Sequence, residues 1–136
     1  DLMDEALYPT DYELGDGSKA NLALLAALIR LCDELDIASD RNPDLLYDTE
    51  TMEGMSEKDV FEFSKHEAIH TLKFSEDNIV VIADTDKPDI ADGVIEAIRT
   101  VKETLEYCLS VISKRSDFQI DCKTIKLILN DKEVEV

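Results

Sequence analysis

The chain has 136 residues, of which 44% are apolar and 34% are charged, so we expect one domain with a real hydrophobic core. Its 32 Asp and Glu residues against 14 Lys and Arg residues give a formal net charge of −18. A surface this negative repels nucleic acid and anionic membranes, which argues against both as direct partners and leaves basic proteins and cations as the natural ones.

The acidic excess is concentrated in the first part of the chain. Residues 1–59 contain 16 acidic and 4 basic residues, a net charge of −12, whereas residues 60–136 contain 16 and 10, a net charge of −6. This imbalance predicts an acidic interaction surface in the first part. The alternative is that these carboxylates only keep the surface soluble.

The three cysteines, Cys32, Cys108 and Cys122, lie far apart in apolar contexts and match no metal-ligand spacing. We interpret them as buried thiols in a reducing compartment, which predicts a cytoplasmic protein. No apolar stretch approaches the length of a membrane span, and no basic region followed by an apolar segment marks a secretory signal.

The first part of the chain predicts an arm, a helix and a long connection. Residues 1–16 show no sustained hydrophobic period, so we expect an irregular arm anchored by its tyrosines. Ser18 has the side chain of an N-cap, and the helix predicted over 18–36 has an apolar face broad enough to be largely buried. The polar connection 38–55 is long for a compact domain and is therefore a candidate for function.

The second part predicts two hairpins around a long helix. Residues 56–65 form a short helix capped by Ser56, and the alternation and apolar run over 67–83 indicate a β-hairpin. Apolar residues at spacings of three and four predict a helix over 88–114. The alternation over 118–136 then changes phase, which predicts a second hairpin with a β-bulge near Lys123 and Thr124.

These elements predict a single acidic α+β domain over residues 1–136. We expect an antiparallel sheet of about four strands in two hairpins. The long helix lies between the hairpins in sequence, and the N-terminal helix packs on one face.

One short segment carries a motif of metal chemistry. Residues 66–70 read His-Glu-Ala-Ile-His, which resembles the zinc-binding motif of zincin metallopeptidases. That resemblance implies that His66 and His70 hold zinc and that Glu67 activates a water. The two histidines lie about 6 Å apart on a helix but roughly 13 Å apart on a strand. The alternation from Glu67 to Phe74 favours the strand, although residues 66–72 remain open to either assignment.

A second acidic group stands where the apolar run ends and the long helix begins. Asp84, Asp86, Asp89 and Asp92 surround Pro88 in this stretch. We expect Asp86 to cap the helix and the later carboxylates to complement the positive end of its dipole. A metal site made of these carboxylates is the alternative.

The leading hypothesis is a non-enzymatic acidic protein-interaction module that binds a basic protein partner, with no catalytic residue and no cofactor. Immunity proteins for basic nucleases, inhibitors that mimic nucleic acid and small secretion chaperones share this size and charge. We expect carboxylates to steer association and apolar anchors to slow dissociation. The predicted partner-binding residues are Asp36, Asp40, Asp44, Tyr47, Asp48, Glu50 and Glu53.

Two alternatives compete with this hypothesis. The first is a zinc-dependent hydrolase that uses His66, Glu67 and His70. The second is a structural subunit of a larger assembly, in which case the apolar face of the helix over 18–36 is partly exposed in the isolated chain. A homo-oligomer is compatible with the sequence.

Overall fold

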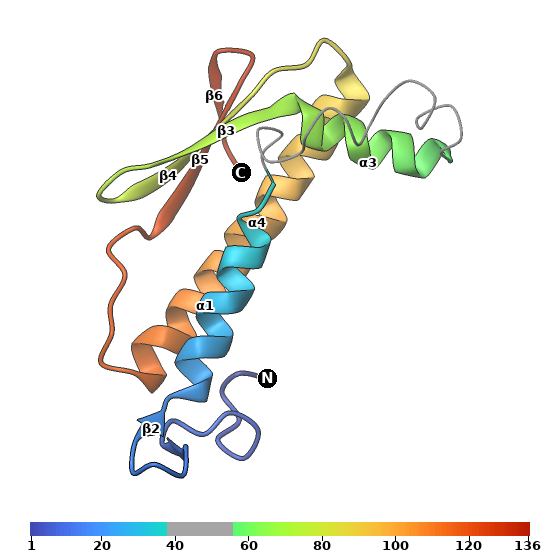
Figure 1. Ribbon diagram of the computed structural model, residues 1–136. Coiled ribbons are helices and arrows are strands. Elements are labelled where there is room, and N and C mark those ends of the chain that lie inside the picture. The colour runs from blue at the N-terminus through green and yellow to red at the C-terminus, as the bar shows by residue number, and fades with distance from the viewer. Residues whose placement is uncertain (38–55) are drawn as a thin grey trace.

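The computed structural model describes residues 1–37 and 56–136 of the chain. Figure 1 shows a long helix that joins a sheet at one end of the molecule to the N-terminal arm at the other. The elements are β1 (Tyr12–Glu13), β2 (Lys19–Ala20), α1 (Leu22–Glu34), α3 (Glu57–Ala68), β3 (Ile69–Phe74), β4 (Asn78–Ala83), α4 (Pro88–Arg115), β5 (Thr124–Leu129) and β6 (Lys132–Val134).

The main sheet has the strand order β3-β4-β5-β6. Both predicted hairpins are present, because β3 pairs with β4 and β5 pairs with β6 in antiparallel fashion. The central strands β4 and β5 are parallel, with Val81 opposite Leu127, so the fold is α+β with a mixed sheet. The prediction of a wholly antiparallel sheet was wrong, since a helix between two neighbouring strands returns the chain to the end where the first strand began.

The core lies between one face of this sheet and α4. Alternate residues of β4 and β5 are buried, which places Val81 and Leu127 among the least exposed side chains of the described residues. On α4 the buried stripe runs from Ile90 to Ile112, as the spacing of its apolar residues predicts. In Figure 1 the first half of α4 lies beside the sheet and the second half beside α1.

Helix α1 runs antiparallel to α4 and packs on it, so it adds to the helical layer instead of covering the sheet. Its N-cap is Asn21 and not Ser18 as the sequence suggests: the Asn21 Oδ1 accepts a hydrogen bond from the Leu24 N–H at 3.0 Å. The Asn21 Nδ2 donates to the Arg115 carbonyl at 2.8 Å. The same side chain therefore starts α1 and fastens it to the end of α4.

The N-terminal arm is held by α4. The Leu2 side chain is buried in the core. The Leu2 backbone N–H donates to the Tyr107 hydroxyl at 2.9 Å, and the Leu2 carbonyl accepts from Arg115 at 2.7 Å. Arg115 also forms an ion pair with Glu5. The arm is thus ordered, and its strand β1 pairs with β2 just after it. The main tyrosine that anchors the arm is Tyr107 of α4, although Tyr8 also packs against the core.

Helix α3 approaches α4 closely at a glycine. A Cβ atom on Gly93 would lie 2.6 Å from Lys65 Cδ and 2.9 Å from Phe61 Cζ, so these two side chains occupy the space that a larger residue would need. The Lys65 ammonium lies 5.3 Å from the centre of the Phe61 ring. Gly93 therefore sets how closely the two helices pack.

The strand irregularity is not where the sequence places it. The register of β3 and β4 shifts between Ile69 and Thr71, whereas β5 begins at Thr124 and pairs regularly with β4. The phase change near Lys123 and Thr124 marks the start of a strand rather than a bulge within one.

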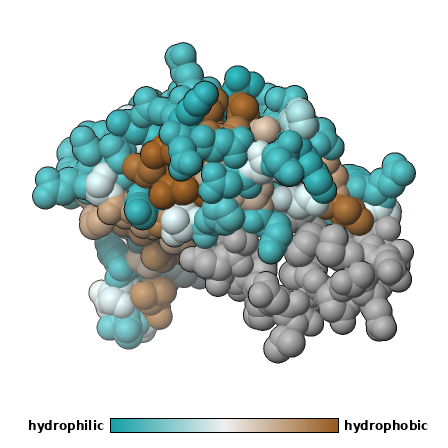
Figure 2. Space-filling view, turned by 90° about the horizontal axis from the view of Figure 1, so that it is seen from above, coloured by the Kyte–Doolittle hydropathy of each residue, from teal (hydrophilic) through white to brown (hydrophobic). Residues whose placement is uncertain are grey.

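The view in Figure 2 shows a mainly hydrophilic surface in which apolar side chains form separate patches. Among the described residues, no helix combines the length and the apolar character that crossing a membrane requires.

Candidate functional site

The outer face of α1 carries an apolar stripe. Leu25, Ile29 and Cys32 follow one another at spacings of four and three, and all three are exposed, with 47% of Leu25 and 69% of Ile29 accessible to solvent. A shallow hollow of about 350 Å³ lies beside them, lined by Leu28, Ile29, Cys32 and Asp33. We call Leu25, Ile29 and Cys32 the α1 stripe.

The stripe is exposed because α1 has more apolar surface than its neighbour can cover. Only one side of the helix, formed by Ala23, Ala27 and Leu31, is buried against α4. The sequence predicts that this helix is largely buried and that Cys32 is a buried thiol, and both predictions were wrong. A single helix neighbour covers one side of a helix, whatever the width of its apolar face.

Carboxylates lie at the end of α1 that follows the stripe. Asp33 and Glu34 lie in the last turn of α1, which contains no basic residue, and Asp36 lies two residues after the helix. The carbonyl end of a helix already carries partial negative charge, so acids placed there add to the helix dipole instead of opposing it. This end of α1 therefore produces a negative potential that attracts a cationic group.

The other end of α1 meets further exposed carboxylates in the arm, at Asp11, Glu13 and Asp16. The Ser18 hydroxyl and N–H both donate to Asp16, and these bonds lower the pKa of its carboxyl below the ordinary value. Asp16 is therefore charged over a wide pH range.

Of the predicted partner-binding residues, one lies in the part of the chain that the structure describes. Asp36 is exposed two residues after the end of α1. The others, Asp40, Asp44, Tyr47, Asp48, Glu50 and Glu53, lie outside the described residues. The predicted acidic segment thus begins where the α1 stripe ends.

The zincin-like segment does not form one helical turn. Helix α3 ends at Ala68, so Glu67 is helical while His70 belongs to β3. The His70 Nε2 lies 3.2 Å from Asp84 Oδ2, and both side chains are about half exposed. The side chain of His66 is outside what the structure describes. No group of three or more metal-binding side chains occurs in the described parts of the chain.

Hydrogen bonds between Thr85 and Asn130 hold the acidic segment that follows β4. Asn130, which follows β5, accepts from the Thr85 N–H and donates to the Thr85 carbonyl, both at 2.9 Å. The N-cap of α4 is Lys87 and not Asp86 as expected, and no side chain caps it, while Pro88 and Asp89 occupy the first turn as predicted. The two bonds between Thr85 and Asn130 join the ends of the parallel strands β4 and β5.

The thiols differ in environment, and none forms a disulfide. Burial raises the pKa of the Cys108 thiol, and burial, with a smaller effect of Asp77, raises that of Cys122. Cys108 fits the prediction of a buried thiol, whereas Cys122 is half-buried and Cys32 is exposed on the stripe.

Comparison with known proteins identifies a family. A family model described as HD-CE matches residues 1–117, which is most of the chain. The chain belongs to the HD-CE family. No curated protein and no solved structure matches it.

The HD-CE match includes the arm, α1, α3, β3, β4 and α4, and it ends two residues after α4. The α1 stripe therefore lies inside the matched region, while β5 and β6 follow it. The leading interpretation of the sequence assigned the whole apolar face of this helix to the core, and only the structural-subunit alternative expected the face to be partly exposed. The one sequence signal for it was the unusual width of that face.

Proposed function

We propose that this HD-CE chain is a non-enzymatic protein-interaction module that binds a basic, amphipathic segment of a partner protein along the α1 stripe. The observation that supports this most is the exposure of Leu25 and Ile29, one turn apart on a helix that ends in carboxylates. An exposed apolar row bordered by charge is typical of a surface that receives the apolar face of another helix.

The apolar residues would supply most of the affinity. Burying the exposed parts of Leu25 and Ile29 contributes on the order of 1 kcal/mol for each side chain. Cys32 adds a small apolar surface at the next turn. A partner helix with large apolar residues at spacings of three and four would cover all three positions.

The carboxylates would select the partner and accelerate association. The net charge of −18 attracts a cationic segment over a distance of about a Debye length and orients it toward the acidic end of α1. Immunity, inhibitor, chaperone and adaptor proteins are the classes for which such complementarity to a basic partner is suited. The exposed thiol on the stripe suits a reducing compartment, so we place the interaction in the cytoplasm.

A synthetic helical peptide with leucines at spacings of three and four and lysines between them tests the proposal. The control is a peptide of equal length with glutamates in place of the lysines. We expect the basic peptide to bind and Ile29→Ser to weaken it about fivefold, mainly through faster dissociation. Asp33→Asn should slow association and flatten its salt dependence. Leu7→Ser, which alters a similarly exposed apolar residue in the arm, is the matched control and should change neither rate.

The proposal fails if Ile29→Ser and Leu7→Ser bind the basic peptide alike, or if the acidic peptide binds as tightly as the basic one. The segment that contains Asp40, Asp44, Asp48 and Glu50 is tested separately: replacing these four acids by amides should slow association as Asp33→Asn does.

A second candidate function is that of a subunit in a larger assembly. The partial exposure of the α1 apolar face is the feature that this alternative requires, and it is present. Two copies of the chain repel each other because each carries −18, so a different subunit suits the surface better than a second copy. Light scattering at physiological salt should show a monomer, and a dimer abolished by Ile29→Ser would instead identify the stripe as a self-association surface.

A further inference from the structure

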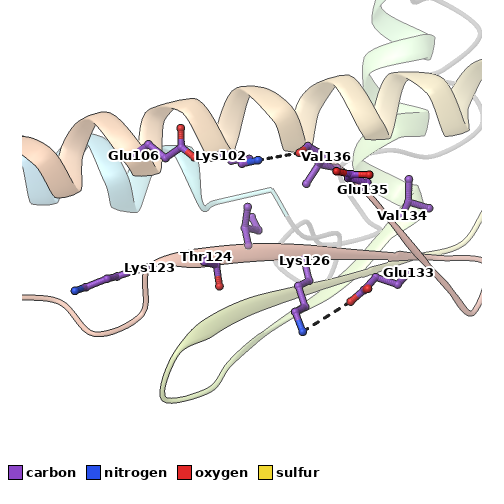
Figure 3. Close-up of a pocket in the computed structure, with 10 residues that line it drawn as sticks. Lys102, Glu106, Lys123, Thr124, Lys126, Glu133, Val134, Glu135 and Val136 are labelled. Carbon is purple, nitrogen blue, oxygen red and sulfur yellow. Dashed lines mark hydrogen bonds and ion pairs between the residues drawn. The ribbon is translucent and has the colours of Figure 1, made fainter.

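Helix α4 is bordered by hollows that differ in what fills them. A groove of about 530 Å³ lies between α4 and β5, and Figure 3 shows that two of its lysines already bind the chain itself. The Lys102 Nζ donates to the Val136 carbonyl at 2.9 Å, and the Lys126 Nζ lies 3.8 Å from Glu133. At the far end of α4, by contrast, a segment from the start of the chain, residues 1–8, lies on the helix (Figure 1). We call residues 1–8 the strap.

The strap crosses α4 at Leu2. The Tyr107 hydroxyl accepts a hydrogen bond from the Leu2 N–H at 2.9 Å, and the Arg115 guanidinium donates to the Leu2 carbonyl at 2.7 Å. Tyr107 and Arg115 are eight positions apart, so they lie two turns apart on one row of the helix, with the buried Val111 midway between them. The site on α4 therefore binds both backbone groups of one residue and buries the side chain of that residue.

The site also binds acidic side chains of the strap. The Tyr107 hydroxyl donates to the Asp1 carboxylate at 2.8 Å, and Arg115 forms an ion pair with Glu5. A second guanidinium lies close by, since Arg30 of α1 is 5.0 Å from the centre of the Tyr107 ring. This part of a chain with a net charge of −18 is thus suited to an acidic segment. The pattern that it binds is a leucine with an acidic residue directly before it and another three positions after it.

The strap itself is held by few buried groups. Leu2 is its one buried residue and Tyr8 is half-buried, while residues 3–7 are exposed. A hollow of about 510 Å³ remains beside the strap, lined by Glu5 and by the last residues of α4. Ordering eight residues costs conformational entropy that one buried leucine offsets only in part. The strap should therefore open far more readily than the core unfolds.

We propose that the strap opens while the rest of the chain stays folded, and that the α4 site beneath it binds a partner segment of the same acidic leucine pattern. Tyr107 and Arg115 would bind the backbone of the partner's leucine, and the partner's acids would replace Asp1 and Glu5. The closed strap occupies this site and is therefore autoinhibitory. A second copy suits the site less well than a partner, because each chain's own strap has a millimolar effective concentration and two copies repel each other.

The test measures the anisotropy of a fluorescein-labelled peptide that has the sequence of residues 1–8. We expect Leu2→Ser to bind this peptide at least about tenfold more tightly than the unchanged chain, because the variant loses the anchor of its own strap. Adding Arg115→Gln to Leu2→Ser should weaken the peptide about tenfold. The matched control is Leu7→Ser, which alters an exposed leucine of the same strap and should bind like the unchanged chain.

Hydrogen exchange of the unchanged chain tests the opening by itself, whether or not Leu2→Ser folds. The Leu2 amide should exchange about a hundredfold or more faster than the amide of Leu105 in α4. Equal exchange of the two amides would overturn the proposal, as would equal peptide binding by Leu2→Ser and Leu7→Ser, or equal binding of a peptide with serine in place of its first leucine. A dimer that Leu2→Ser abolishes would assign the site to a second copy and overturn the partner. Ile29→Ser should change none of these results, so failure here is distinguishable from failure of the α1 proposal.

Discussion

Helices α1 and α4 pack together but differ in how much of their apolar surface is buried. Helix α4 contacts α1, α3 and the sheet, and its apolar stripe is buried along its length. Helix α1 packs mainly on α4, and it leaves Leu25 and Ile29 in solvent. Helix α1 has the more apolar sequence of the two, so composition alone would assign the central position to the wrong helix. The number of neighbours decides which apolar face is core and which is available for binding.

The largest difference is expected between matched leucine truncations in the two helices. Leu105→Ala removes a side chain that is 1% exposed in α4 and should lower the free energy of unfolding by about 2–5 kcal/mol. Leu25→Ala removes one that is half exposed and should change it by less than about 0.5 kcal/mol, because little burial is lost and alanine favours the helix. Urea unfolding of both variants measures the contrast. Equal losses would mean that the α1 stripe is covered in solution.

The thiols give an independent measure of the same contrast. Cys32 on α1 should react with a thiol reagent in the native protein, and Cys108 on α4 about a hundredfold or more slowly, because it must await an opening of the fold. Mass spectrometry of the labelled peptides follows both rates. A protected Cys32 would contradict the exposed stripe.

The raised pKa of Cys108 adds a pH dependence with a definite sign. The folded state binds this proton more tightly than the unfolded state, so the stability that it contributes is complete below the ordinary cysteine pKa. It is lost as the pH rises toward the higher folded value. Cys108→Ser should reduce that alkaline loss of stability, whereas Cys32→Ser should not alter it.

The smallest effect concerns the link between the two helices. Asn21→Ala removes the N-cap bond of α1 and the bond to the Arg115 carbonyl, and it should cost about 1 kcal/mol in urea unfolding. Ser18→Ala, at the residue that the sequence suggests as the cap, should lower the free energy of unfolding by no more than about 0.3 kcal/mol. The reverse order would place the start of α1 at Ser18.

Local patterns predict most of the elements in the described residues. The period of three and four residues locates α4 to within one residue at its end, and alternation locates both hairpins. The parallel pairing of β4 and β5 was missed because it depends on where a 28-residue helix returns the chain, and no local pattern records that path. The position of α1 on α4, instead of on the sheet, is likewise a property of the assembled layers.

The candidate sites were harder to predict than the fold. Charge counting led to Asp36 and the segment after it, but the apolar half of the surface, at Ile29, reads in sequence as part of a core. Which part of the α1 apolar face stays exposed depends on how α1 packs on α4, and the spacing of neighbouring residues does not record that packing.

The attachment of the arm to α4 has a consequence for the order of assembly. The bonds from Tyr107 and Arg115 to Leu2 connect residues 105 and 113 positions apart. During synthesis Leu2 leaves the ribosome several seconds or more before Tyr107 and Arg115 are made, at about 5–20 residues per second. The segment around Leu2 must therefore stay unanchored for that time, and its final docking reports that the last turns of α4 have formed.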